Sequence, residues 1–91
     1  MIEGSVIRTK GVWFSPVHDR AVLYSQDQGR AIVLNPTGAA LWAVLDSPRS
    51  PSDLTAFLMD RFPDLSADRA RADVDAFLDR LLAENVLQLL P

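Results

Sequence analysis

The sequence predicts an α+β domain of winged helix-turn-helix-like architecture, with an N-terminal three-stranded antiparallel meander followed by three helices. Two observations lead to this fold class. Short runs of β-branched and aromatic residues, separated by turn residues, occupy residues 12–34, and helix-type apolar periodicity with capping residues follows over residues 35–85. The chain has 91 residues, of which 48% are hydrophobic, enough for one small core. We therefore expect residues 1–91 to form a single domain.

Each expected strand follows from its residue types. Residues 12–17 and 20–25 are rich in β-branched and aromatic side chains, and a two-residue polar turn joins them. Residues 30–34 form the third strand, after a loop whose last residue, Gly29, is suited to positive φ. Such short connections between successive strands predict an antiparallel meander.

The first two helices are marked by their caps. Asn35 followed by Pro36 is typical of an N-cap and a first helical position, so the first helix should run to about residue 46. After a turn rich in serine and proline, Ser50 or Ser52 caps a second helix, which ends before a Pro-Asp pair.

The third helix is the longest. Ser66 caps it, and we expect it to end near Asn85, before an apolar tail over residues 86–90 that folds back on the domain. Its apolar stripe consists of Ala70, Val74, Phe77, Leu78, Leu81 and Leu82.

Composition excludes several classes of function. The chain contains no cysteine, which removes disulfides, thiolate metal sites and cysteine nucleophiles. Its net charge is −3, without the basic cluster that nucleic-acid binding usually needs. The N-terminus lacks the apolar core of a signal peptide, and no stretch approaches the roughly 18 to 20 apolar residues of a membrane span. We expect a cytoplasmic protein without nucleic-acid or membrane partners.

Few side chains are suited to catalysis. His18 is the single histidine, and its place in a turn beside Asp19 indicates a surface residue rather than a catalytic base. The sequence contains no nucleophile elbow, phosphate-binding glycine loop or zinc-protease motif. Aspartates of the third helix alternate with arginines, which is typical of a solvated, ion-paired surface. We expect no catalytic residues, no metal site, no cofactor and no enzyme activity.

The two tryptophans have different settings. Trp42 lies in the middle of the first helix and should belong to the core. Trp13 lies on a strand that is half exposed in a meander of this kind, so core packing and ligand contact are both compatible with it.

The third strand poses a question about its edge. The first strand carries Pro16, which removes a backbone donor and protects that edge. The third strand has no proline or charged residue within residues 31–34 to protect its edge. It is apolar on both faces, with Ala31 and Val33 on one face and Ile32 and Leu34 on the other. Either the third helix, the tail or a second copy covers this edge, or a peptide adds to it as a further strand. Residue types alone favour neither.

Two motifs indicate a family. The third strand ends in Leu34-Asn35, and a G-x-x-x-W-x-x-L pattern follows over residues 38–45. A D-V-x-x-F-L-x-x-L pattern occupies Asp73, Val74, Phe77, Leu78 and Leu81. In their order and spacing, from about Val12 to Leu90, these features resemble the PqqD-like family, the precursor-recognition domains of ribosomal peptide natural-product pathways.

The resemblance implies a non-catalytic function. Members of this kind bind the leader region of a precursor peptide as an extended strand beside the third strand, in a groove closed by the third helix. The short, unfused chain looks most like the stand-alone domain of lasso-peptide clusters, which presents the precursor to a cysteine-protease-like leader peptidase and then a macrolactam cyclase. The hairpin residues 22–27 differ from the LLYPEG type of the pyrroloquinoline quinone pathway. A peptide chaperone for a radical-SAM enzyme in that or another pathway is the alternative.

A helical wheel then suggests a leader-binding groove. Backbone groups of the third strand would supply ladder bonds, and one flank of the third helix would face the peptide. On that flank, Val74 and Leu78 would line an apolar pocket with Ala31 and Val33, while Arg71 and Asp75 would select polar groups at the rim. The proposed leader-binding residues are Arg30, Ala31, Ile32, Val33, Leu34, Arg71, Val74, Asp75 and Leu78.

Several alternatives bear on this mapping. Asp73, Phe77 and Glu84 lie on the opposite flank, and a one-residue change of strand register would exchange the two faces of the third strand. A DNA-binding winged helix predicts a basic third helix, whereas this one is acidic on balance, and a carrier protein needs an attachment serine in a recognisable context. Since an open edge can also pair with itself, we expect a monomer or a weak dimer.

Overall fold

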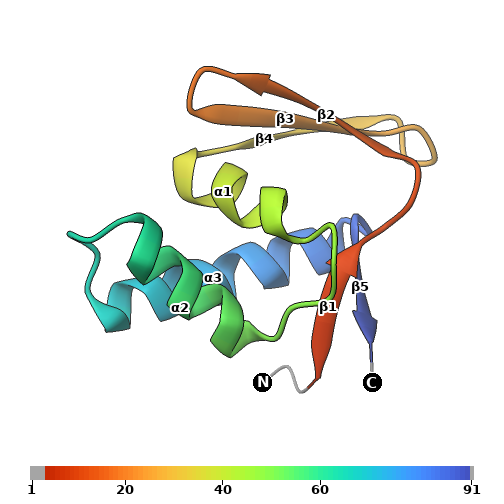
Figure 1. The fold of residues 1–91 in the computed structure, drawn as a ribbon. Coiled ribbons are helices and arrows are strands. Elements are labelled where there is room, and N and C mark those ends of the chain that lie inside the picture. Colours follow the sequence, from red (N-terminus) through yellow and green to blue (C-terminus); the bar gives the residue numbers. More distant parts are fainter. Residues whose placement is uncertain (1–3, 91) are drawn as a thin grey trace.

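The computed structural model describes residues 4–90 and confirms the predicted fold class. Strands β2, β3 and β4 form an antiparallel meander in that order, and β1 pairs with β5 in a second sheet. Figure 1 shows α1 between the meander and the layer formed by α2 and α3, with β1 and β5 side by side at one end of the helices. The elements are β1 (Ser5–Arg8), β2 (Val12–Val17), β3 (Arg20–Ser25), β4 (Arg30–Leu34), α1 (Pro36–Val44), α2 (Pro51–Arg61), α3 (Ala67–Ala83) and β5 (Leu87–Leu90).

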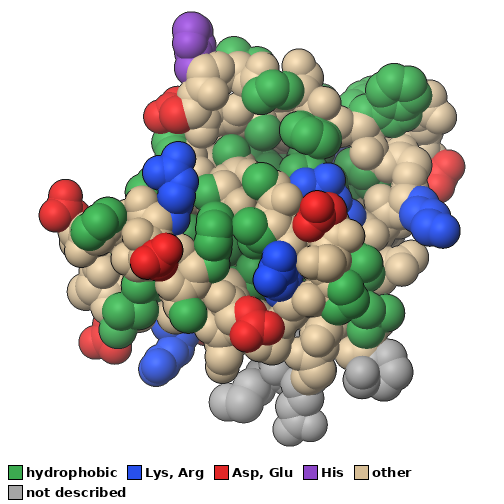
Figure 2. All heavy atoms as spheres, in the orientation of Figure 1, with side chains coloured by type: hydrophobic (Ala, Val, Ile, Leu, Met, Phe, Trp, Pro, Cys, Tyr) green, Lys and Arg blue, Asp and Glu red, His purple; other side chains and the backbone are tan. Residues whose placement is uncertain are grey.

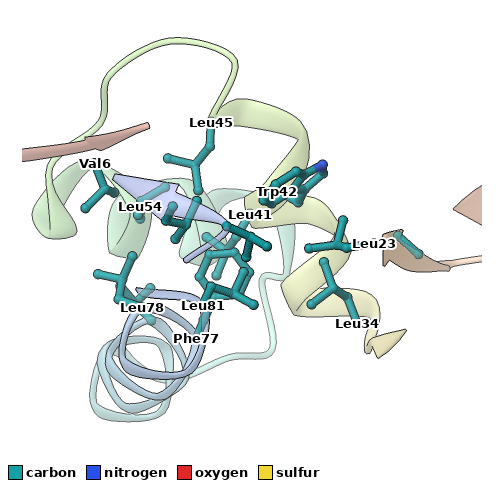
Figure 3. Close-up of a cluster of buried hydrophobic side chains, with 14 of the residues drawn as sticks. Val6, Leu23, Leu34, Leu41, Trp42, Leu45, Leu54, Phe77, Leu78 and Leu81 are labelled. Carbon is teal, nitrogen blue, oxygen red and sulfur yellow. The ribbon is translucent and has the colours of Figure 1, made fainter. Parts of the chain in front are cut away.

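The meander buries one face. Leu23 and Leu34 are 0% and 4% exposed, and Figure 3 shows both pointing toward the α1 side chains Leu41 and Trp42. Ile32 lies opposite Leu23 in the β3–β4 ladder and is buried on the same face. Strand alternation therefore turns Ala31 and Val33 of β4 to the outer face, as the sequence predicts.

The core joins α1 to both neighbouring layers. Figure 3 shows Phe77, Leu78 and Leu81 of α3 gathered beside Leu41 and Leu54. Trp42 is 1% exposed, which confirms its predicted core position. Trp13, whose setting the sequence leaves open, is 65% exposed on β2.

Capping side chains begin each helix. Asn35 Oδ1 accepts a hydrogen bond from Gly38 N at 2.8 Å at the start of α1. Ser50, one of the two expected candidates, caps α2 and forms a capping box with Asp53. Ser66 caps α3 as expected. These local hydrogen bonds explain why the helix starts are readable from the sequence.

Helix α3 ends in a Schellman motif. Glu84 is the C-cap, and Asn85 follows it with a φ of 60° in the left-handed region. The amides of Asn85 and Val86 donate to the carbonyls of Leu82 and Leu81, both at 3.1 Å. Asn85, which the sequence predicts as the cap, thus lies one residue after the observed cap, Glu84, and directs the chain into β5.

The β1–β5 sheet is an element that the sequence reasoning missed. The C-terminal tail folds back as expected, but it does so by pairing with β1, with Val6 opposite Leu89. Val6 also exchanges backbone hydrogen bonds with Arg49 at 2.8 and 3.0 Å. Arg8 then connects this sheet to α1, because its Nε donates to the carbonyl oxygen of Trp42 at 2.8 Å.

Candidate functional site

The outer edge of β4 is open. Within residues 4–90, β4 pairs with β3 alone, and the tail that the sequence left as a possible cover pairs with β1 instead. In an antiparallel strand the backbone groups of alternate residues point to opposite sides, so part of the β4 backbone has no partner in the described chain. The other outer strand, β2, carries Pro16 at its edge. Of these two edges, β4 is therefore the better suited to accept a further strand.

A hollow of about 280 Å³ lies between β4 and α3. On the sheet side it is lined by Val33 and Leu34, and beyond the end of β4 by Thr37 and Gly38 of α1. A Cβ on Gly38 would lie 3.1 Å from Asn35 Oδ1 and 3.4 Å from Leu34 Cβ, tighter than most contacts of this kind. Glycine at this position therefore lets the first turn of α1 approach the end of β4 closely.

One flank of α3 forms the opposite wall of this hollow. Ala76, Phe77 and Leu81 supply its apolar part, and Asp73 and Arg80 supply polar groups. Phe77 is 8% exposed and Leu81 is fully buried, so the floor of the hollow is continuous with the core. The structure thus combines an open strand edge with an apolar hollow beside it, which together we call the β4–α3 groove.

An ion pair crosses the far end of this groove. Arg30 Nη1 at the start of β4 lies 3.4 Å from Glu84 Oε2 at the end of α3. The pair thus joins opposite walls of the groove at that end.

The structure places the predicted flank of α3 elsewhere. Val74 and Leu78 are fully buried, and Figure 3 shows Leu78 pointing into the core beside Leu54. Arg71 and Asp75 line a separate depression with the N-terminal half of α2. None of these four residues lines the hollow beside β4, so the predicted pocket is not built from them in this geometry, and their part in leader binding stays a prediction. A helical wheel gives the two flanks of a buried stripe, but the packing of α2 decides which flank stays near the sheet.

The predicted strand residues do lie at the groove. All five residues of β4 belong to its open edge, and Val33 also lines the hollow. Leu34 lines the hollow as well, while the side chains of Ile32 and Leu34 are buried in the core. Sequence reasoning missed Ala76 and Arg80 as wall residues. Asp73 and Phe77 lie on the opposite flank from Arg71 and Asp75. Since both flanks mix apolar and charged residues in a similar way, the sequence offers no signal for preferring this one.

Other kinds of site find no support in residues 4–90. This part of the chain contains no group of three or more His, Cys, Asp or Glu residues that could hold a metal ion. In the same residues, no helix has the length and apolar character that crossing a bilayer requires. Figure 2 shows basic and acidic side chains interspersed on the face it draws, rather than a continuous basic surface there.

Comparison with known proteins identifies related sequences and folds. The family described as "Coenzyme PQQ synthesis protein D (PqqD)" matches residues 20–87. No curated protein matches the chain with statistical significance. The solved structure described as "TbiB1 in Complex with the TbiA(beta) Leader Peptide" superposes with a TM-score of 0.80 at 18% sequence identity, covering 93% of this chain and 98% of that chain. At this identity the structural match shows a shared fold.

Proposed function

The chain belongs to the PqqD family, and on this basis we propose that it binds the leader region of a ribosomally made precursor peptide without catalysing a reaction. The observation that carries the proposal is the open edge of β4 beside an apolar hollow against α3. The similarity in fold to TbiB1, which was solved with a leader peptide, supports it.

The groove offers two kinds of contact to an extended peptide. Unpartnered backbone groups of Arg30–Leu34 form ladder hydrogen bonds with it, which give affinity with little dependence on sequence. Alternate side chains of the added strand then point into the hollow, where Val33, Phe77 and Leu81 provide an apolar surface. A large apolar side chain of the leader fits this surface best.

We extend the proposal to the pathway. The precursor is of the lasso-peptide type, and the protein presents it to a separate cysteine-protease-like leader peptidase and then to a macrolactam cyclase. The hairpin residues 22–27, which depart from the quinone-pathway pattern, support this version. The alternative, a chaperone for a radical-SAM enzyme, is favoured by the quinone-synthesis description of the matching family.

Fluorescence polarisation with a labelled leader peptide tests leader binding. The probe is the synthetic leader of the precursor encoded beside the gene. Val33→Asp introduces a charge at the groove and should weaken binding at least about tenfold. Leu89→Asp is the matched control, because Leu89 and Val33 are both 55% exposed and Leu89 lies on β5, in the other sheet. Equal binding by both variants, or no binding by the wild type, would contradict the proposal.

A further inference from the structure

We infer that the β4–α3 groove contains a subsite for an acidic side chain of its peptide, formed by Arg20 and Arg80 above the apolar floor. This inference rests on the proposed function and adds to it the chemical class of one leader residue. It is carried by the charges around the hollow, which differ from the charge of the protein as a whole.

Both arginines lie at the same hollow. Arg20 begins β3, next to the end of β4, because its neighbour Ala21 pairs with Leu34. Arg80 lies on the wall formed by α3. Both residues are exposed, and both line the hollow. Two cationic side chains from different elements therefore converge on one open space.

Neither guanidinium has an acidic partner in the described part of the chain. The ion pairs found in residues 4–90 are Arg30 with Glu84 and Arg69 with Asp73, at 3.4 and 3.2 Å. Asp73 is the acidic residue that lines the hollow, and its Oδ1 accepts a hydrogen bond from Arg69 Nε. The acid that lines the hollow is thus already engaged by a third arginine.

The local charge is opposite to the overall charge. The protein carries a net charge of −3, yet both acids on the groove flank of α3, Asp73 and Glu84, are balanced by arginines. Among the charged residues that line the hollow, Arg20 and Arg80 are the ones that form no ion pair within residues 4–90. On the other flank, Asp75 and Asp79 outnumber Arg71 around the depression beside α2. An acidic peptide group is therefore attracted to one flank of α3 and repelled by the other.

Asn35 adds an uncharged hydrogen-bond donor to the hollow that Arg20 and Arg80 line. The backbone N–H of Gly38 can only donate, so the Asn35 atom it contacts at 2.8 Å is the carbonyl oxygen Oδ1. Thr37 Oγ1 lies 3.1 Å from the same oxygen. The Asn35 NH₂ group consequently remains available at the hollow, where Asn35 is a lining residue.

The floor beneath these groups strengthens their effect. Phe77 and Leu81 exclude water from one side of the hollow, and a charge-assisted hydrogen bond at such a half-buried site is stronger than one in open solvent. The bound segment should therefore combine an apolar residue on the floor with an aspartate or glutamate near the arginines.

A double-mutant cycle between peptide and protein tests this pairing. The probes are the labelled leader of the precursor encoded beside the gene and variants in which each Asp or Glu is replaced singly by Asn or Gln. The proteins are the wild type, Arg20→Gln, Arg80→Gln and the control Arg71→Gln from the opposite flank. All three arginines are exposed, so these variants should fold normally.

One of the acid replacements in the leader should weaken its binding to the wild type and to Arg71→Gln about fivefold. The same replacement should weaken binding to Arg80→Gln or Arg20→Gln less than about twofold, because the partner of the acid is already missing there. The wild-type effect should also shrink as salt is raised from about 0.05 M to about 0.5 M. If the wild type binds the leader and every acid replacement changes affinity less than about twofold, the subsite is wrong and leader binding stands. If the wild type does not bind the leader, the proposed function fails, and the subsite fails with it.

Discussion

Arg30 Nη1 lies 3.4 Å from Glu84 Oε2, and this ion pair connects the first residue of β4 to the residue that caps α3. It joins the two walls of the groove at one end. The Arg30 side chain is 64% exposed, so solvent screens the pair and its contribution to stability should be small.

Replacing Glu84 by glutamine tests how much this pair contributes. We expect the free energy of unfolding to change by less than about 1 kcal/mol, as is usual for exposed ion pairs. Urea denaturation of Glu84→Gln and of the control Asp75→Asn, on the opposite flank, measures the difference. A loss well above that limit would mean that the pair holds the two walls together.

Bulk placed in the hollow should block the peptide. Ala76 and Ala72 are both exposed on α3, but only Ala76 lines the hollow. We expect Ala76→Trp to weaken leader binding at least about tenfold and Ala72→Trp to leave it unchanged. The free energies of unfolding of the two variants should agree within about 1 kcal/mol, because both replace an exposed alanine in the same helix. Polarisation binding and urea denaturation provide the two measurements, and equal binding would place the peptide outside the hollow.

Leu78 should be structural. It is fully buried, so Leu78→Ala should lower the free energy of unfolding by about 2 to 5 kcal/mol through lost burial and an internal cavity. Arg71 lies about two turns away along α3 and is exposed, so Arg71→Ala should change the free energy of unfolding by less than about 0.5 kcal/mol. Arg71→Ala should also bind leader normally, because Arg71 faces α2. Reduced leader affinity in Arg71→Ala would restore the original assignment of this flank.

Asn85 holds the left-handed turn that ends α3. Its φ of 60° is strained for most side chains and free of strain for glycine. We expect Asn85→Ala to lower the free energy of unfolding by about 1 kcal/mol and Asn85→Gly to leave it unchanged or raise it. Thermal denaturation compares the two variants, and equal stability would show that the turn does not depend on this conformation.

The capping box of α2 should give stability a defined dependence on pH. The backbone N–H of Ser50, and next its hydroxyl, lower the pKa of the Asp53 carboxyl in the folded protein. A lowered folded pKa means that the stabilisation is fully present above the pKa of the unfolded chain and disappears as pH falls through the folded value. The stability difference between wild type and Asp53→Asn should therefore shrink below the ordinary Asp pKa.

Urea denaturation over a series of acidic pH values measures that difference. Ser50→Ala removes the hydroxyl partner and should shift the loss toward higher pH, because part of the cause of the lowered pKa is gone. A difference that stays constant with pH would contradict this role for Asp53.

Much of this architecture follows from short-range chemistry. Asn35, Ser50 and Ser66 begin their helices through hydrogen bonds to amides three residues ahead, and such contacts depend on neighbours in the chain. The alternation of Ala31 and Val33 with buried neighbours likewise follows from the two-residue period of a strand. These features, and the core position of Trp42, could be predicted from the sequence. Residue types left the edge of β4 undecided, and it is the pairing of the C-terminal tail with β1 that leaves this edge open.

The flank of α3 beside β4 depends on contacts across the whole chain. Both flanks of the α3 stripe around Val74 carry similar mixtures of apolar and charged residues. Helix α2 packs beside the flank with Arg71 and Asp75, which leaves the flank with Phe77 and Arg80 beside the sheet. The pairing of β1 with β5 also depends on the tertiary structure, because it joins opposite ends of the sequence. Local propensity specifies the three meander strands and the three helices with their buried faces, whereas the packing of the layers decides which neighbour each exposed flank has and which distant segments pair.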